Sequence, residues 1–70
     1  MCEIIFLVEE DPEGGYTARA LGYPIFTEAD TEDALRESVL DALRCHFDNE
    51  EEIPKIVRLH FVREQTIVNA

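Results

Sequence analysis

The stretch CEIIFLVEEDPEGGYTARAL at residues 2–21 decides the fold, because it holds two apolar segments joined by a short polar turn. In an extended chain successive side chains point to opposite sides, so the first segment, residues 2–9, can be divided into two faces. One face carries Ile4, Phe6 and Val8, and the other carries Ile5 and Leu7. Two apolar faces are typical of a strand in the middle of a sheet. The segment therefore predicts a central strand, with a further layer over its second face.

The turn EDPEGG at residues 10–15 connects this strand to a second one at Tyr16–Leu21. Proline presets φ and the two glycines can adopt positive φ, so the two segments should form a β-hairpin. Gly22 to Pro24 interrupt the chain again before a short third strand at Ile25–Glu28. That connection is too short for a crossover, which predicts an antiparallel meander of three strands.

A helix is expected to begin after Asp30 and Thr31, which are both good N-cap residues, because Glu32 and Asp33 then put negative charge in its first turn. Apolar and small residues recur at spacings of three and four along the face expected to meet the sheet. They are Ala34, Leu35, Ser38, Val39, Ala42, Leu43, His46 and Phe47.

A fourth strand is expected at Ile56–Arg63, after the acidic loop Asp48–Glu52 and the break at Pro54. A helix that connects two strands of one sheet usually makes them parallel. The sequence thus predicts a single α+β domain over residues 1–70 in the order β-β-β-α-β, with the fourth strand parallel to the first and the helix on one face. Residues 64–70 either extend the last strand or fray.

Composition excludes several classes of protein. Sixteen acidic residues against six basic ones give a net charge of −10, which is unsuited to direct nucleic-acid binding, and 46% hydrophobic residues are too many for a disordered acidic tail. Cys2 and Cys45 make no disulfide framework, and the N-terminus lacks a basic region and a long apolar run. We expect a cytoplasmic protein with reduced thiols and no membrane segment.

The element order and the residues at its joints resemble the N-terminal domain of HicB-like antitoxins. The resemblance rests on the apolar first strand and on the motifs that follow it. These are Glu9-Glu10-Asp11-Pro12-Glu13-Gly14-Gly15-Tyr16-Thr17-Ala18, Leu21-Gly22, Thr27-Glu28-Ala29-Asp30-Thr31, Asp33-Ala34-Leu35 and Ile53-Pro54.

The resemblance implies a partial ribonuclease-H-like fold that acts by covering a small basic toxin, an RNA-cleaving protein of a type II toxin-antitoxin system. Members of the family typically continue into a DNA-binding module, whereas this sequence stops at Ala70, so no operator binding is expected. The alternative is an orphan oligomeric HicB-like domain without a toxin partner.

Catalytic, metal-binding and cofactor-binding residues are not expected. A ribonuclease-H-type site needs carboxylates converging on two metal ions, with an acid in the middle of the first strand, where this chain has only apolar residues. Cys45 and His46 are adjacent, and with Cys2 and His60 they match no zinc-ligand spacing. We interpret both cysteines as small core residues and the protein as not an enzyme.

Twelve of the sixteen acids fall in three runs. Such runs either form solvated loops or mimic the backbone of RNA and dock on the basic residues of a toxin. One of the three runs, Glu28, Asp30, Glu32 and Asp33, lies at the expected helix start, where the helix dipole favours negative charge. The residues predicted to contact the partner are Glu9, Glu10, Asp11 and Glu13 together with Asp48, Glu50, Glu51 and Glu52.

A mixed apolar patch is expected on the sheet face away from the helix. An exposed patch of this kind usually marks an interface, so the sequence predicts a homodimer or higher even oligomer through this face or through a strand edge. The residues predicted for self-association are Ile5, Leu7, Ile56, Arg58, His60 and Val62.

Overall fold

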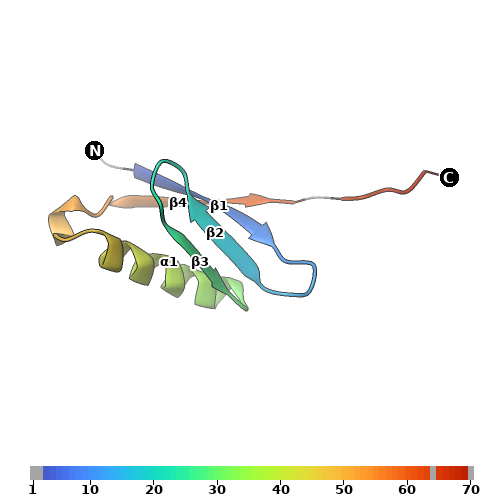
Figure 1. Ribbon diagram of the computed structural model, residues 1–70, viewed down its shortest axis with the longest axis horizontal. Helices are drawn as coiled ribbons and strands as arrows, with labels where there is room; N and C mark the ends of the chain where they lie inside the picture. The colour runs from blue at the N-terminus through green and yellow to red at the C-terminus, as the bar shows by residue number, and fades with distance from the viewer. Residues whose placement is uncertain (1–2, 64, 70) are drawn as a thin grey trace.

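The computed structural model describes residues 3–63 and 65–69 and shows a four-stranded sheet with one helix (Figure 1). The elements are β1 (Glu3–Glu10), β2 (Tyr16–Ala20), β3 (Phe26–Ala29), α1 (Glu32–His46), a short 3-10 helix η1 (Glu50–Glu52) and β4 (Ile56–Val62). The strand order is β3-β2-β1-β4, in which β4 is parallel to β1 and the other neighbours are antiparallel. The predicted α+β fold is confirmed, and each strand ends within a residue or so of its expected position.

The β1–β2 turn owes its shape to a carboxylate and two glycines. Asp11 Oδ1 accepts a hydrogen bond from the backbone N–H of Glu13 at 2.9 Å, and Gly14 and Gly15 have φ of +106° and +91°. A Cβ atom on Gly15 would lie 3.1 Å from the carbonyl oxygen of Ala29. This turn therefore packs closely against the end of β3.

Helix α1 begins at Thr31, whose Oγ1 accepts a hydrogen bond from the N–H of Ala34 at 3.1 Å. Its buried residues, Leu35, Val39 and Leu43, form one row at a spacing of four.

The predicted apolar face of α1 was too wide. Ala34 and His46 are exposed, and Ser38 and Ala42 are only partly buried. Cys45 is also exposed, so its interpretation as a core residue was wrong: it follows Leu43 by two positions, about 200° around the helix. Cys2, the other expected core cysteine, lies outside the described residues.

The core lies between α1 and one face of the sheet. It contains Ile4, Phe6 and Val8 of β1, Ala18 and Ala20 of β2, Ile25, and the buried row of α1. The two alanines are small, which lets α1 approach the sheet closely over β2 and β3. The half of the sheet around β4 is less well covered, and there Phe61 of β4 and Leu40 of α1 are exposed.

The sheet face opposite α1, called the outer face below, has no helix or strand of the described residues over it. Ile5 and Leu7 lie there half-buried between their neighbours. The sequence predicted a further layer on this side, and the described part of the chain does not supply one. Residues 65–69, called the tail below, continue from β4 away from the sheet in Figure 1.

Candidate functional site

Two acidic runs that are separate in the sequence meet at one end of the sheet. The strand register places Thr17 between Glu9 of β1 and Glu28 of β3, and it places Tyr16 between Glu10 and Ala29. Asp11, Glu28 and Asp30 also line one shallow hollow beside Tyr16. We call this cluster the acidic end, and it consists of Glu9, Glu10, Asp11, Glu13, Glu28, Asp30, Glu32 and Asp33.

Tyr16 lies within the acidic end, and its pKa responds to the negative charge around it. Its pKa is raised above the ordinary value of 10.0, first by desolvation and then by the negative charges of Glu10 and Glu32. The ring makes an edge-to-face contact with Phe61, with ring centroids 6.4 Å apart. The phenol is thus held near these carboxylates by packing on the helix side of the sheet.

Charge compensation at the acidic end is sparse. Asp33 pairs with Arg36 one turn along α1, and no other ion pair involves these carboxylates among the described residues. A second, wider hollow of about 630 Å³ lies where β4 ends. Its lining includes Glu9, Glu10 and Asp11 together with Arg63 and the tail residue Thr66. The arrangement can receive the lysine and arginine side chains of another molecule.

The eight acids predicted to contact a partner do not form one surface. Those at residues 9–13 belong to the acidic end, whereas residues 48–52 lie in and before η1, at the opposite end of the sheet (Figure 1). The run at residues 28–33 joins the first, although Glu32 and Asp33 do lie in the first turn of α1 as the sequence predicted. A short connection between two antiparallel strands fixes which residues lie opposite each other. The short β2–β3 connection is therefore the signal in the sequence that could have placed Glu28 beside Thr17.

All six residues predicted for self-association lie on the outer face. The parallel register places Ile5 beside Arg58 and Leu7 beside His60. Ile56 and Val62 lie at the two ends of the same row on β4, beside Glu3 and Glu9. Arg58 Nε is 2.8 Å from Oε2 of Glu3, the ion pair that joins the two strands.

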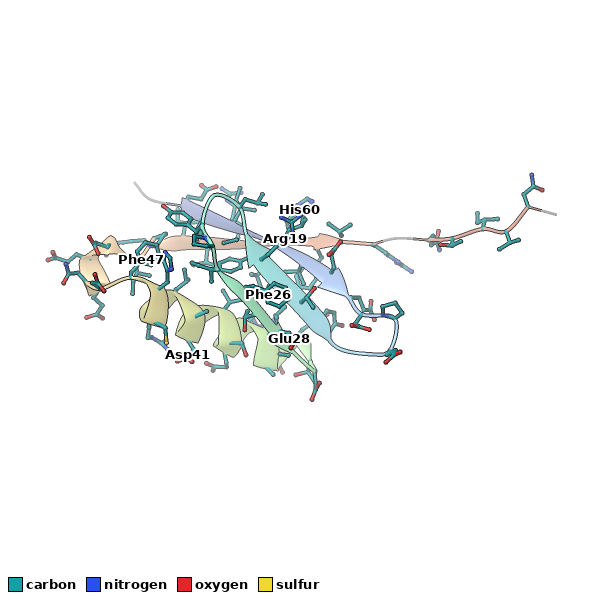
Figure 2. The ribbon with its side chains drawn as sticks, viewed as in Figure 1. Arg19, Phe26, Glu28, Asp41, Phe47 and His60 are labelled. Atoms are coloured by element: carbon teal, nitrogen blue, oxygen red, sulfur yellow. The ribbon has the colours of Figure 1, made fainter. Side chains whose placement is uncertain are left out.

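The outer face also holds residues that the sequence reading did not include. Arg19 of β2 lies beside Leu7, opposite His60, and Phe26 of β3 follows it in the same row (Figure 2). Phe26 is 61% exposed. The patch therefore extends across all four strands, and cationic and apolar side chains alternate on it.

Within residues 3–63 and 65–69, no three His, Cys, Asp or Glu side chains lie close enough together to hold a metal ion. In the same part of the chain, the helices are too short or too polar to cross a membrane.

Two proteins with the description UPF0150 protein are similar to this chain. One, from Thermotoga maritima, is 45% identical over 65 residues, which cover 93% of this chain and 90% of that protein. The other, from Archaeoglobus fulgidus, is 57% identical over 53 residues, which cover 76% of this chain and 77% of that protein. No family model matches the chain, and no solved structure matches it.

Proposed function

The chain belongs to the UPF0150 family, and from the acidic end and the resemblance of its sequence to HicB-like antitoxins we propose that it is a binding protein of that type, without enzymatic activity. Its partner is a small basic RNA-cleaving toxin of a type II toxin-antitoxin system, which it masks. Masking requires a large complementary surface and no catalytic group. The protein acts in the cytoplasm, where such a toxin meets its RNA.

The observation that carries this proposal is the acidic end. Eight carboxylates from two separate segments gather there, and a single arginine, Arg36, pairs with one of them among the described residues. Uncompensated charge of this density attracts a basic partner over a long range and accelerates its association. Glu9 and Glu28 of this cluster lie at one end of the outer face, and the rest of that face stays free for other contacts.

The middle of β1 favours binding over catalysis. Ile4, Phe6 and Val8 occupy the helix side of this strand and are buried, while Ile5 and Leu7 occupy the other side. A ribonuclease-H-type nuclease would need a carboxylate here to hold its metal ions. The strand and helix order is compatible with a partial ribonuclease-H-like fold in which the catalytic acids have no counterpart.

The test uses the product of any neighbouring gene that encodes a short basic protein. Co-expression should give a stable complex and restore the growth of cells that the toxin arrests. In stopped-flow mixing, the variant Glu10→Gln/Asp11→Asn/Glu32→Gln should associate at least about tenfold more slowly at low salt, with a weaker dependence on ionic strength.

The matched control neutralises the same number of charges at the other end of the sheet. Glu50→Gln/Glu51→Gln/Glu52→Gln should leave the association rate within about twofold of the unmodified protein, because η1 lies far from the proposed contact. Equal effects of the two triple variants would mean that only net charge matters, and the acidic end would not be the docking surface.

A second candidate function is favoured by the outer face. Its exposed apolar residues Leu21 and Phe26 form part of a patch that crosses the whole sheet. A surface of this kind is typical of self-association. In this reading the protein is an orphan oligomeric domain without a toxin, and deletion of its gene would cause no growth arrest that depends on a neighbouring gene.

A further inference from the structure

The tail carries the most exposed hydrophobic side chains in the described structure. Ile67 and Val68 are 86% and 87% exposed, and they follow an extended path beyond the end of β4. Two large aliphatic neighbours fully in water are costly, since burying either one is favourable. The two side chains therefore lack an apolar partner among the residues that the structure describes.

The neighbouring edge of the sheet also lacks a partner. β4 is the last strand in the order β3-β2-β1-β4, so half of its backbone N–H and C=O groups face outward. Beside it, on the helix side, lies a groove of about 200 Å³ lined by Val57 and Leu59 of β4 and by Arg36, Val39 and Leu40 of α1. We call this the α1/β4 groove.

Charge makes this edge the natural place for a second copy to approach. The chain has a net charge of −10, so two copies repel each other wherever carboxylates meet. Neither β4 nor the α1/β4 groove contains an acidic residue, and β4 carries Arg58 and His60. Repulsion between carboxylates is therefore weaker when two copies meet here than when they meet at the acidic end.

The tail cannot easily fold back onto its own β4. A strand that reverses needs a tight turn, usually built from Gly, Asn, Asp or Pro. The stretch VREQTIV at residues 62–68 contains none of them. Five residues of tail also span only about 17 Å when extended, too little to turn and then cover a seven-residue strand. A second chain running in the opposite direction meets neither obstacle.

We propose that two copies of this chain pair antiparallel through β4 and exchange their tails, with Val62 of each copy on the twofold axis. In this register Ile67 lies opposite Val57 of the second copy, and Val68 lies opposite the second copy's Ile56. The period of two places Ile67 over the α1/β4 groove and Val68 on the outer face. The result is an eight-stranded sheet with the two helices on one side.

This register gives the two exposed aliphatic side chains of the tail aliphatic neighbours. The side chains of Ile67 and Val68 meet aliphatic residues, and the polar Thr66 lies opposite Arg58 of the second copy. A shift of one residue would turn Ile67 to the wrong face of the sheet, away from the groove. The edge backbone of both copies becomes hydrogen-bonded at the same time, which closes the open edge.

Sedimentation of the purified protein tests the pairing. The unmodified chain should be a dimer in the micromolar range, and Ile67→Asn/Val68→Asn should weaken it by about 100-fold or more without changing net charge. The matched control, Leu21→Asn/Phe26→Asn, removes two exposed apolar residues from the outer face and should leave the dimer intact. Circular dichroism of both variants checks that the monomer is folded.

Disulfide trapping tests the register in chains where Cys2 and Cys45 are replaced by serine. Val57→Cys/Ile67→Cys should oxidise to a covalent dimer, because opposite residues of antiparallel strands lie within disulfide reach. Val57→Cys/Val68→Cys should not, because those side chains lie on opposite faces of the sheet.

A monomeric unmodified chain, a dimer that survives the tail variant, or a dimer lost in the outer-face variant would each overturn the proposal. Equal cross-linking of the two cysteine pairs would refute the register. None of these measurements needs a toxin, so the result stands apart from the proposed antitoxin role.

Discussion

Arg58 of β4 contacts Glu3 of β1 through Nε and Oε2, which are 2.8 Å apart, and the contact runs diagonally across the outer face. The register places Glu3 beside Ile56 and Arg58 beside Ile5. The ion pair therefore joins Glu3 to the residue two positions beyond its direct neighbour on β4. It ties the start of β1 to the strand that forms the sheet edge. β4 is held to the sheet by its seven-residue parallel pairing with β1, and the ion pair adds one side-chain contact to that pairing.

Replacing Glu3 by glutamine should lower the free energy of unfolding by less than about 1 kcal/mol, because the Arg58 side chain is 64% exposed and water screens the pair. Urea unfolding at low protein concentration measures the change. Glu9→Gln is the matched control, since Glu9 also lies on the outer face of β1 but in no ion pair among the described residues. A loss above about 2 kcal/mol in Glu3→Gln would mean that the pair is far better shielded than its exposure indicates.

The clustered carboxylates predict that salt stabilises the protein. Raising the ionic strength from about 10 mM to about 150 mM shortens the screening length from roughly 30 Å to 8 Å, which weakens repulsion within the acidic end. The unfolding temperature should therefore rise by several degrees. Glu10→Gln/Glu32→Gln should reduce this rise more than Glu37→Gln/Asp41→Asn, which neutralises two acids outside the cluster. A flat or falling melting temperature would argue against repulsion at the acidic end.

Tyr16 should ionise above the ordinary pKa of 10.0, because desolvation and the nearby Glu10 and Glu32 carboxylates disfavour the phenolate. The folded state then holds the proton more tightly than the unfolded state does. The resulting stabilisation is fully present when the pH is below the pKa that Tyr16 has in the unfolded state. It is lost as the pH rises through the higher pKa that Tyr16 has in the folded state. Ultraviolet absorbance of Tyr23→Phe, which leaves Tyr16 as the one tyrosine, measures its titration.

Glu32→Gln supplies the control for this titration, since it should move the Tyr16 pKa back toward its ordinary value. In Tyr16→Phe, the alkaline loss of stability should become smaller. A Tyr16 titration at or below pH 10.0 would show that the phenol is freely solvated and that the acidic end does not surround it.

Most of the fold could be predicted because local chemistry determines it. Apolar residues on both faces of residues 4–8 indicated a central strand, and β1 is central. Thr31 was one of two candidate N-caps, and its hydroxyl is the group that caps α1. The apolar face of the helix was overestimated because residue spacing alone cannot show how narrow the contact with the sheet is. Cys45 lies on the side of the helix away from the buried row.

The candidate surfaces were harder to predict, because they depend on which strands lie side by side. The residues at 5, 7, 56, 58, 60 and 62 follow from strand alternation and a parallel pairing, so the sequence could place them together. The acidic runs could not be placed in this way. Their grouping depends on the register between β2 and β3, which brings Glu28 to Thr17 and leaves η1 at the other end.

Leu35→Ala should destabilise the protein by about 2–5 kcal/mol, because this side chain is fully buried between α1 and the sheet and its removal leaves a cavity. Leu40→Ala, in the same helix, should cost less than about 1 kcal/mol in the monomer, since Leu40 is exposed beside β4. Urea unfolding of both variants below the concentration at which copies associate gives the comparison. Similar losses would mean that α1 packs through a different row.

Gly15→Ala should destabilise the protein more than Gly14→Ala, by at least about 1 kcal/mol, although both glycines have positive φ. A Cβ on Gly14 meets no atom within 4 Å, so that variant suffers the backbone strain alone. A Cβ on Gly15 would lie 3.1 Å from the carbonyl oxygen of Ala29, which is held in place by the pairing of β3 with β2. Equal losses in thermal unfolding would show that the end of β3 yields freely, and the acidic end would then be a flexible surface instead of a preformed one.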